Sequence, residues 1–331
     1  MDINREIQLL TAKYNQELTR LGNQLRLNVA IINRYRITTA NKLSLIRVVT
    51  NKYNNDIKRL TAEYNNKKAV LLQKTSKKAL LVGINYRNTP YELYGCINDT
   101  KNIQTLLRDK FYYNSFNLLT DDTEFKPTKR NIVNELTNLL VNSKAGDNLF
   151  FLFSGHGSYM VDKNGDELDS RDEVIFPIDG SNNANSYITD DEIRKIIDNN
   201  LKPDTNLFMI FDACFSGTIC DLRYNYLVDG KLVDNSRVEL TKSNVIVISG
   251  CTDNQTSIDA FVSYNGSNIN SGALTFSFLE TIQTMGINIS LKMLIENMRN
   301  LLQTNGFEQI PQLSSGRLID IDKTILREGI I

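Results

Sequence analysis

Residues 206–217 read NLFMIFDACFSG, an apolar run that ends in a cysteine flanked by small and polar residues. Such a short, continuously apolar run predicts a strand that is buried on both faces of a sheet. A second run of the same kind, NLFFLF at 148–153, is followed by Ser-Gly-His-Gly. His156, the only histidine of the chain, therefore stands after one strand as Cys214 stands after the other. We expect both at one edge of a parallel sheet, where the sites of such sheets gather.

Cysteine and histidine together have a chemistry that neither has alone. A cysteine after an apolar strand is most often an inert core residue, and a lone histidine is most often structural. A cysteine nucleophile, however, needs a neighbouring base to form its thiolate and an acid to protonate the leaving group. One imidazole serves both needs. The pairing of Cys214 with His156 predicts nucleophilic catalysis.

Further apolar runs alternate with helical periodicity from residue 77 onward. We expect strands at 77–85, 116–120, 148–153, 206–211 and 244–248, and helices at 98–109, after Pro127, at 190–200, 274–283 and 291–303. Asn98 or Asp99 should lie near the cap of its helix. This alternation predicts an α/β fold, with a mostly parallel central sheet flanked by helices.

Residues 1–75 differ from the rest in composition. They contain no proline and one glycine, and apolar residues recur at helical spacing in two similar segments, TAKYNQELTRL (11–21) and TNKYNNDIKRL (50–60). We predict an N-terminal helical hairpin, with a turn and helix cap at 38–41. Residues 1–78 carry 16 Lys/Arg and 5 Asp/Glu, a balance of +11, which leaves −11 for residues 79–331. A regulatory or oligomerising role is favoured: the hairpin packs on the acidic remainder or self-associates. A basic arm for nucleic acid or anionic lipid is the less favoured interpretation.

The chain also lacks several features. No apolar run is long enough to span a membrane, and the N-terminus lacks a secretory signal. The four cysteines are too few and scattered for a disulfide scaffold, so we expect reduced thiols and a cytoplasmic protein.

Residues 77 to about 316 resemble the catalytic domain of metacaspases, a branch of the caspase-like cysteine proteases. The matching stretches, in the family's order, are ALLVGINY (79–86), YGCINDT (94–100), FSGHGS (153–158), DEVIFPID (172–179), ITDDEI (188–193), DACFSGT (212–218), SGCTDNQTS (249–257) and IPQLSSG (310–316). The resemblance implies a caspase-like fold and a dyad of Cys214 as nucleophile and His156 as general base and acid. It also implies an oxyanion site made of the N–H groups of Gly157 and Cys214.

The resemblance also implies a substrate pocket. Asp99 and Asp212 would line it, with Ser154 and Cys96 in its wall. Two carboxylates in one pocket select a cation, so we expect cleavage of protein or peptide substrates after Arg or Lys. The Gln-Ala-Cys-Arg-Gly motif of caspases, which cut after Asp, is absent.

Metacaspases often need calcium, and the resemblance implies Asp172, Asp190, Asp191 and Asp221 as ligands of an activating Ca²⁺. Asp169 competes with Asp172, and Asp190 and Asp191 also fit a helix start. The acidic loop from Asp162 to Glu173 is no EF-hand, because Glu167 replaces the required glycine.

We therefore divide the chain into a hairpin (1–75), a large catalytic part (76–222), a linker (223–242) and a small catalytic part (243–331). Candidate self-cleavage points of a zymogen in or at the linker are Arg223, Lys231, Arg237 and Lys242. Two alternatives remain open. One is a non-proteolytic adaptor on the same fold, against which the intact dyad argues. The other is a paracaspase-like protease that needs no calcium.

Overall fold

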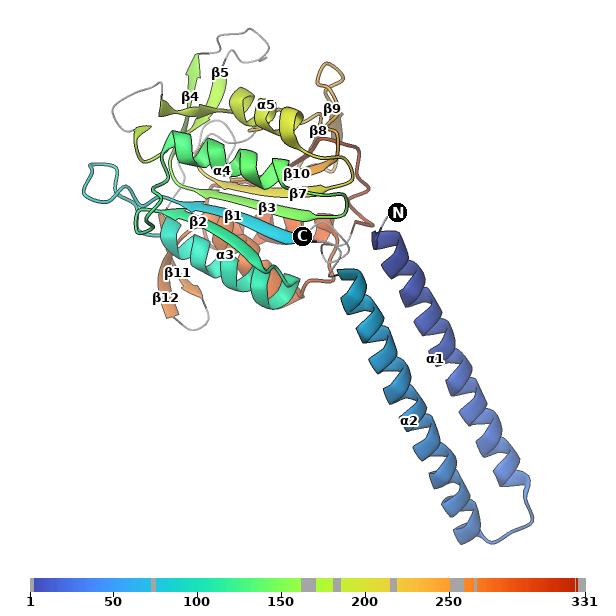
Figure 1. The fold of residues 1–331 in the computed structure, drawn as a ribbon. Coiled ribbons are helices and arrows are strands. Elements are labelled where there is room, and N and C mark those ends of the chain that lie inside the picture. Colours follow the sequence, from blue (N-terminus) through green and yellow to red (C-terminus); the bar gives the residue numbers. More distant parts are fainter. Residues whose placement is uncertain are drawn as a thin grey trace. The chain divides into compact units, whose positions relative to one another are not determined.

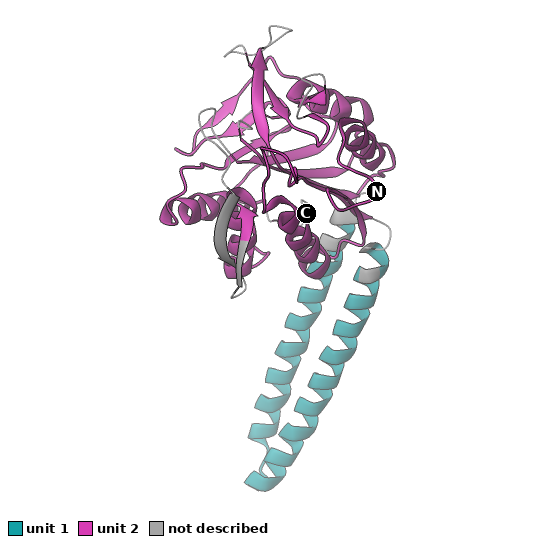
Figure 2. Cartoon of the chain, turned by 90° about the vertical axis from the view of Figure 1, so that its left-hand side faces the viewer, with its two compact units in different colours: residues 1–75 teal, residues 76–331 magenta. Residues whose placement is uncertain are grey.

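In the computed structural model, residues 3–72, 76–161, 171–180, 186–214, 219–250, 259–264, 267–324 and 326 are described. The chain divides into two compact units, the hairpin unit (1–75) and the α/β unit (76–331), which are coloured separately in Figure 2. Their elements, labelled in Figure 1, are α1 (Ile3–Arg34), α2 (Thr39–Leu72), β1 (Lys77–Gly83), α3 (Cys96–Phe111), β2 (Ser115–Thr120), α4 (Lys129–Val141), β3 (Asn148–Ser154), β4 (Gly157–Val161), β5 (Arg171–Ile175), β6 (Ile188–Thr189), α5 (Asp190–Asn200), β7 (Asn206–Asp212), β8 (Tyr224–Tyr226), β9 (Leu232–Asp234), β10 (Asn244–Ser249), β11 (Asp259–Tyr264), β12 (Ser267–Gly272), α6 (Ala273–Met285), α7 (Leu291–Thr304) and β13 (Gln312–Ser315).

The hairpin unit consists of the two long helices α1 and α2, which lie side by side (Figure 1). The rings of Tyr14 and Tyr64 stack with centroids 4.4 Å apart, and the Tyr14 hydroxyl lies 3.0 Å from Thr61 Oγ1. Thr38 caps α2, because its Oγ1 accepts a hydrogen bond from the Asn41 N–H. The predicted hairpin is confirmed. Among the described residues, no helix combines the length and the apolar content that crossing a membrane requires.

The α/β unit is built on an eight-stranded sheet in the order β2-β1-β3-β7-β10-β13-β8-β9. The first five strands of this order pair in parallel, and the last three pair antiparallel. The sheet is therefore mostly parallel and flanked by helices, which confirms the predicted caspase-like α/β architecture. The central strands β3 and β7 are buried along their whole length, as their unbroken apolar runs predict.

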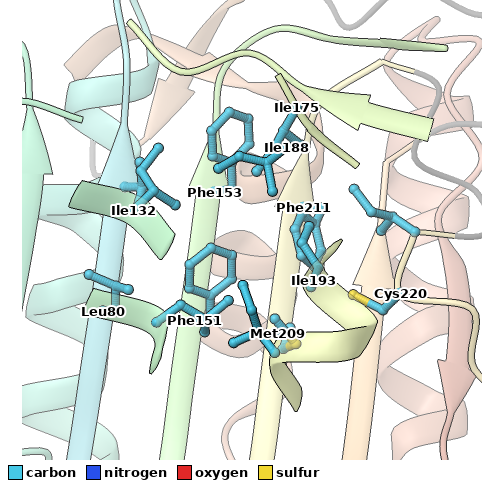
Figure 3. Close-up of a cluster of buried hydrophobic side chains, with 14 of the residues drawn as sticks. Leu80, Ile132, Phe151, Phe153, Ile175, Ile188, Ile193, Met209, Phe211 and Cys220 are labelled. Atoms are coloured by element: carbon cyan, nitrogen blue, oxygen red, sulfur yellow. The ribbon is translucent and has the colours of Figure 1, made fainter. Parts of the chain in front are cut away.

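Each face of the sheet has its own core, because successive side chains of a strand point to opposite faces. Leu81 and Phe150 belong to the core under α3, α6 and α7. Their neighbours Leu80 and Phe151 belong to the core under α4 and α5, part of which is shown in Figure 3. Because both faces are packed, the ends of the strands are held in fixed positions.

Three parts of the α/β unit differ from the predictions. Helix α3 begins at Cys96 with Gly95 as its N-cap, so Asp99 lies inside its first turn and not at its cap. The region predicted as a linker, 223–242, contributes strands β8 and β9 to the edge of the sheet. The small sheet β4-β5-β6 and the hairpin β11-β12 were not predicted, since their short strands show no clear alternation of polar and apolar residues.

Candidate active site

The ends of β3 and β7 lie side by side. Ser154 pairs with Asp212 in parallel register, and the Gly155 N–H donates to the Asp212 carbonyl at 3.2 Å. His156 and Cys214 each follow two residues later, just beyond the ends of strands that lie about 4.8 Å apart. The structure therefore brings the two predicted catalytic residues to the same edge.

The chain segments that carry these residues touch each other through their backbones. A side chain at Gly157 would collide with the Cys214 carbonyl oxygen and with the Ala213 side chain, so only glycine fits there. Cys214 is buried, 7% exposed, and is not in a disulfide. The predicted oxyanion donors, the N–H groups of Gly157 and Cys214, thus belong to the two touching segments. Residues 215–218, which complete the motif, lie outside the described residues.

The imidazole of His156 has a hydrogen-bond partner that the sequence did not reveal. Its Nε2 lies 2.7 Å from the main-chain carbonyl oxygen of Tyr91. Because a carbonyl can only accept, Nε2 carries the hydrogen of the neutral ring, and Nδ1 is left with the lone pair of a base.

Tyr86 holds the backbone of His156. Its hydroxyl accepts a hydrogen bond from the His156 N–H at 2.9 Å and donates one to the Phe176 carbonyl at 2.6 Å. The Phe176 N–H in turn donates to the His156 carbonyl at 3.0 Å, and the two rings of Tyr86 and His156 lie 4.7 Å apart. Burial raises the pKa of Tyr86, so the hydroxyl stays protonated and able to donate. The sequence did not indicate this role.

Asp99 and Asp212, the two predicted pocket carboxylates, are buried together beside the strand ends. Asp99 accepts hydrogen bonds from the Ser154 hydroxyl at 2.7 Å, the Ser271 hydroxyl at 2.5 Å and the Gly272 N–H at 3.0 Å. Burial raises the pKa of Asp99, and the nearby Asp212 carboxylate raises it further. The structure thus unites Asp99, Asp212 and Ser154 in one acidic site.

The start of α6 covers this acidic site. The Thr275 N–H donates to Asp212 Oδ2 at 2.7 Å, and a side chain at Gly272 would collide with the Asp212 carboxylate. Asp99 and Asp212 are only 0% and 2% exposed. Ser271 and Gly272 were not identified from the sequence, because they lie more than 170 residues from Asp99 along the chain.

Cys96, the fourth predicted pocket residue, is the first residue of α3 and precedes Asp99 by three positions. It is buried, and it lies near enough to Tyr86 to affect the pKa of the tyrosine hydroxyl. Cys96 therefore lies about one helical turn before Asp99, at the start of the same helix.

The predicted calcium ligands lie on three segments: Asp172 on β5, Asp190 and Asp191 at the start of α5, and Asp221 after β7. Asp190 already accepts hydrogen bonds from the Glu173 N–H at 2.7 Å and the Asp191 N–H at 2.8 Å.

Two of these carboxylates, Asp190 and Asp221, lie near the thiol of Cys220. Burial raises the pKa of the Cys220 thiol, and Asp221, Asp190 and Glu173 raise it further, while Arg194 acts in the opposite direction. Carboxylate oxygens are the donors that Ca²⁺ prefers, so the residue types fit this ion. Within the described part of the chain, however, no three acidic, histidine or cysteine side chains already have an arrangement that would hold a metal. Most of the acidic loop, including Asp162, Asp166, Glu167 and Asp169, lies outside the described residues.

The four candidate self-cleavage residues differ in their surroundings. Arg223 pairs with Asp234 at 2.7 Å across β8 and β9, and Lys231 pairs with Asp229 at 2.6 Å. Lys231, Arg237 and Lys242 are exposed, whereas Arg223 is half-buried. An exposed side chain is the more accessible to a peptidase.

Comparisons with known proteins agree with the architecture. The family model of the metacaspase peptidase C14 domain matches residues 77–223. Metacaspase-1 of Meyerozyma guilliermondii is 34% identical, over 74% of this chain and 71% of that protein. Metacaspase-1A of Aspergillus oryzae is 34% identical, over 77% and 72% respectively. A solved structure of a protein from Geobacter sulfurreducens covers 76% of this chain and 99% of its own, with a TM-score of 0.55 at 20% identity, a likeness of fold alone.

The Tyr86 hydroxyl should affect the reactivity of Cys214 through His156. Tyr86→Phe leaves the half-buried N–H of His156 without this partner, which costs about 1–3 kcal/mol and loosens the imidazole. We expect alkylation of Cys214 by iodoacetamide at neutral pH, followed by mass spectrometry of its peptide, to slow about tenfold.

Tyr113→Phe is the matched control for this experiment. The Tyr113 hydroxyl is also buried, but it has no hydrogen-bond partner among the described residues. Its loss should leave the alkylation rate unchanged. Equal rates for Tyr86→Phe and the wild type would contradict the role given to Tyr86.

Proposed function

Because the chain belongs to the metacaspase family of cysteine-type peptidases, we propose that it is an endopeptidase that cuts proteins after Arg or Lys. The observation that supports this specificity is the buried pair Asp99 and Asp212 beside the end of the strand that leads to Cys214. Burying two carboxylates side by side is unfavourable, and a substrate guanidinium or ammonium would compensate both.

The proposed reaction uses Cys214 and His156 in two steps. Nδ1 of His156 takes the proton of Cys214 Sγ, and the thiolate attacks the carbonyl carbon of the scissile bond. The N–H groups of Gly157 and Cys214 stabilise the oxyanion, and the imidazolium then protonates the leaving amine. Water, deprotonated by the same imidazole, releases the acyl group from sulfur. The Tyr91 carbonyl keeps the ring in the tautomer that both steps need.

The closed acidic site supports a latent form of the enzyme. Ser271 and Gly272 donate to Asp99 where a substrate cation would have to bind, and both carboxylates are covered. A substrate therefore reaches them only after the segment around Ser271 moves. We propose that the activating step is calcium binding, cleavage after an exposed basic residue, or both. The exposed basic residues are those at 231, 237 and 242.

Peptide hydrolysis tests the proposed activity. We expect turnover of fluorogenic peptides ending in Arg and Lys but not of those ending in Asp, and none by Cys214→Ala. Asp99→Asn and Asp212→Asn should each lower kcat/KM for the Arg peptide by at least about a hundredfold, because each removes a buried charge that pairs with the substrate.

Two results would favour other functions, and two more bear on the pocket and on self-processing. Failure of the wild type to cleave any peptide, with or without calcium, would favour the non-proteolytic adaptor. Equal cleavage with and without calcium would favour the paracaspase-like enzyme. Cleavage after Asp would refute the pocket. Fragments of the wild type that are missing from Cys214→Ala would demonstrate self-processing.

The Asp99 carboxyl should also make the fold less stable at neutral pH. Its pKa is higher in the folded than in the unfolded chain, so folding favours the protonated form, and stability falls as pH rises through the pKa of the folded state. Asp99→Asn should therefore raise the midpoint of thermal unfolding by a few degrees near pH 7. The gain should vanish as the pH approaches about 4.

Asp147 is the matched control for Asp99. It is equally buried, but it accepts hydrogen bonds from the Ser76 N–H and hydroxyl and lies 3.6 Å from the Lys78 ammonium. Asp147→Asn should lower the unfolding midpoint, because its charge is compensated. A lower midpoint for Asp99→Asn would show that its carboxylate is stabilising, against the argument above.

Calcium binding can be measured without activity. We expect Ca²⁺, but not Mg²⁺ at the same concentration, to raise the unfolding midpoint of Cys214→Ala and to release heat on titration, because a ligand of the native state alone stabilises it. Adding Asp172→Asn or Asp221→Asn should abolish both effects. Asp229→Asn, at an exposed aspartate paired with Lys231, should leave them intact. If Cys214→Ala with all four predicted calcium ligands intact binds no Ca²⁺, the proposal of calcium control fails while the peptidase proposal stands.

A further inference from the structure

The hairpin unit has two ends of different chemistry. The hairpin tip, defined as residues 26–48, contains the end of α1, the turn and the start of α2. Seven large apolar side chains of the tip are exposed, by 39% to 63%: Leu27, Ile31, Tyr35, Ile37, Leu43, Leu45 and Val48. In the rest of the described hairpin only Leu9 and Val70 are comparably exposed. Apolar side chains thus gather where the two helices meet the turn.

The charge of the hairpin tip has one sign. No acidic residue lies between Glu17 and Asp56, while this stretch contains Arg20, Arg26, Arg34, Arg36, Lys42, Arg47 and Lys52. The ion pairs of the hairpin lie outside the tip, where Glu17 pairs with Arg20 and Asp56 with Arg59. Within the described residues, the five cations of the tip form no ion pair, although Lys42 donates to the Asn33 carbonyl.

Exposed apolar groups and cations without ion pairs, at one end of the hairpin, restrict what can bind there. A second copy of the same tip is disfavoured, because it presents only like charges. Nucleic acid would use the cations, but it offers no place for leucine, isoleucine and valine side chains, and Tyr35 is the only aromatic residue of the tip.

We propose that the hairpin tip binds the surface of an anionic lipid bilayer. The apolar side chains enter the boundary between headgroups and acyl chains, and the arginines reach the anionic headgroups with their long stems. Apolar burial and cationic attraction are the two contributions that together give stable attachment to a membrane surface. The proposal requires no helix that crosses the bilayer, and it is independent of the proposed peptidase activity.

Flotation with lipid vesicles tests the proposal on the full-length chain carrying Cys214→Ala. We expect it to bind phosphatidylcholine vesicles that contain phosphatidylserine and to bind pure phosphatidylcholine weakly, with binding that falls as salt rises. Arg34→Gln with Arg36→Gln should lower the partition coefficient about 25-fold, since each basic residue near an anionic surface contributes about fivefold. Leu43→Gln with Val48→Gln should lower it about tenfold or more.

Matched variants separate the tip from the rest of the hairpin. Leu9→Gln with Val70→Gln changes two side chains of similar exposure outside the tip. Lys58→Gln with Lys67→Gln changes two charges outside it. Both pairs should bind vesicles as before, and circular dichroism should show unchanged helix content in all four double variants.

Other outcomes would overturn the proposal. These are equal binding to both kinds of vesicle, an equal loss of binding in the control pairs, and binding to a DNA duplex but to neither vesicle. Absence of vesicle binding together with a dimer that the tip substitutions dissociate would make the tip a contact between copies of the chain instead.

Discussion

The parallel pairing of β3 with β7 is the constraint on which the site depends. In-register pairing of Ser154 with Asp212 fixes where both strands end, and the next residues have little freedom, because Gly157 lies directly against the Cys214 carbonyl. Two packed cores hold the strands from both faces. Neither the histidine nor the cysteine needs a long or flexible connection to meet the other, so their relative position follows from the sheet itself.

The same strand ends also hold charges that oppose folding. Asp99 and Asp212 are buried together, and hydrogen bonds from Ser154, Ser271 and Gly272 only partly offset the loss of water around Asp99. A site of this kind is less stable than an apolar one of equal volume, and it becomes favourable when a cation enters it. Two buried carboxylates are therefore better suited to a site that binds a cation than to a structural core.

The sequence predicted the parts of the structure that have a strong local signal. Unbroken apolar runs predicted the central strands, and helical periodicity predicted the hairpin. The motifs after the strands predicted His156 and Cys214, whose pairing needs only the rule that parallel strands end at one edge. Asp99 and Asp212 were identified as pocket residues through resemblance alone, and the helix of Asp99 begins two residues earlier than predicted.

Groups that act through the backbone or across long separations had no such signal. A main-chain carbonyl is present in every residue, so no sequence pattern distinguishes the carbonyl of Tyr91. Tyr86 is conspicuous only once its hydroxyl is seen between His156 and Phe176. Periodicity also could not show that apolar side chains of the hairpin tip are exposed. It identifies the apolar residues at helical spacing that pack between the two helices, and it does not describe apolar residues at other positions.

Arg194 connects both ends of a segment, residues 221–239, that contains three of the four candidate cleavage points. Its guanidinium donates to the Asp221 carbonyl on one side and to the Glu239 carbonyl on the other. Strand β8 is hydrogen-bonded to β13, and β10 lies between β7 and β13. Breaking one peptide bond in this segment would therefore separate the covalent chain without separating the sheet. The two fragments would remain a single folded particle, and cleavage would act by releasing a tether and not by dissociating a subunit.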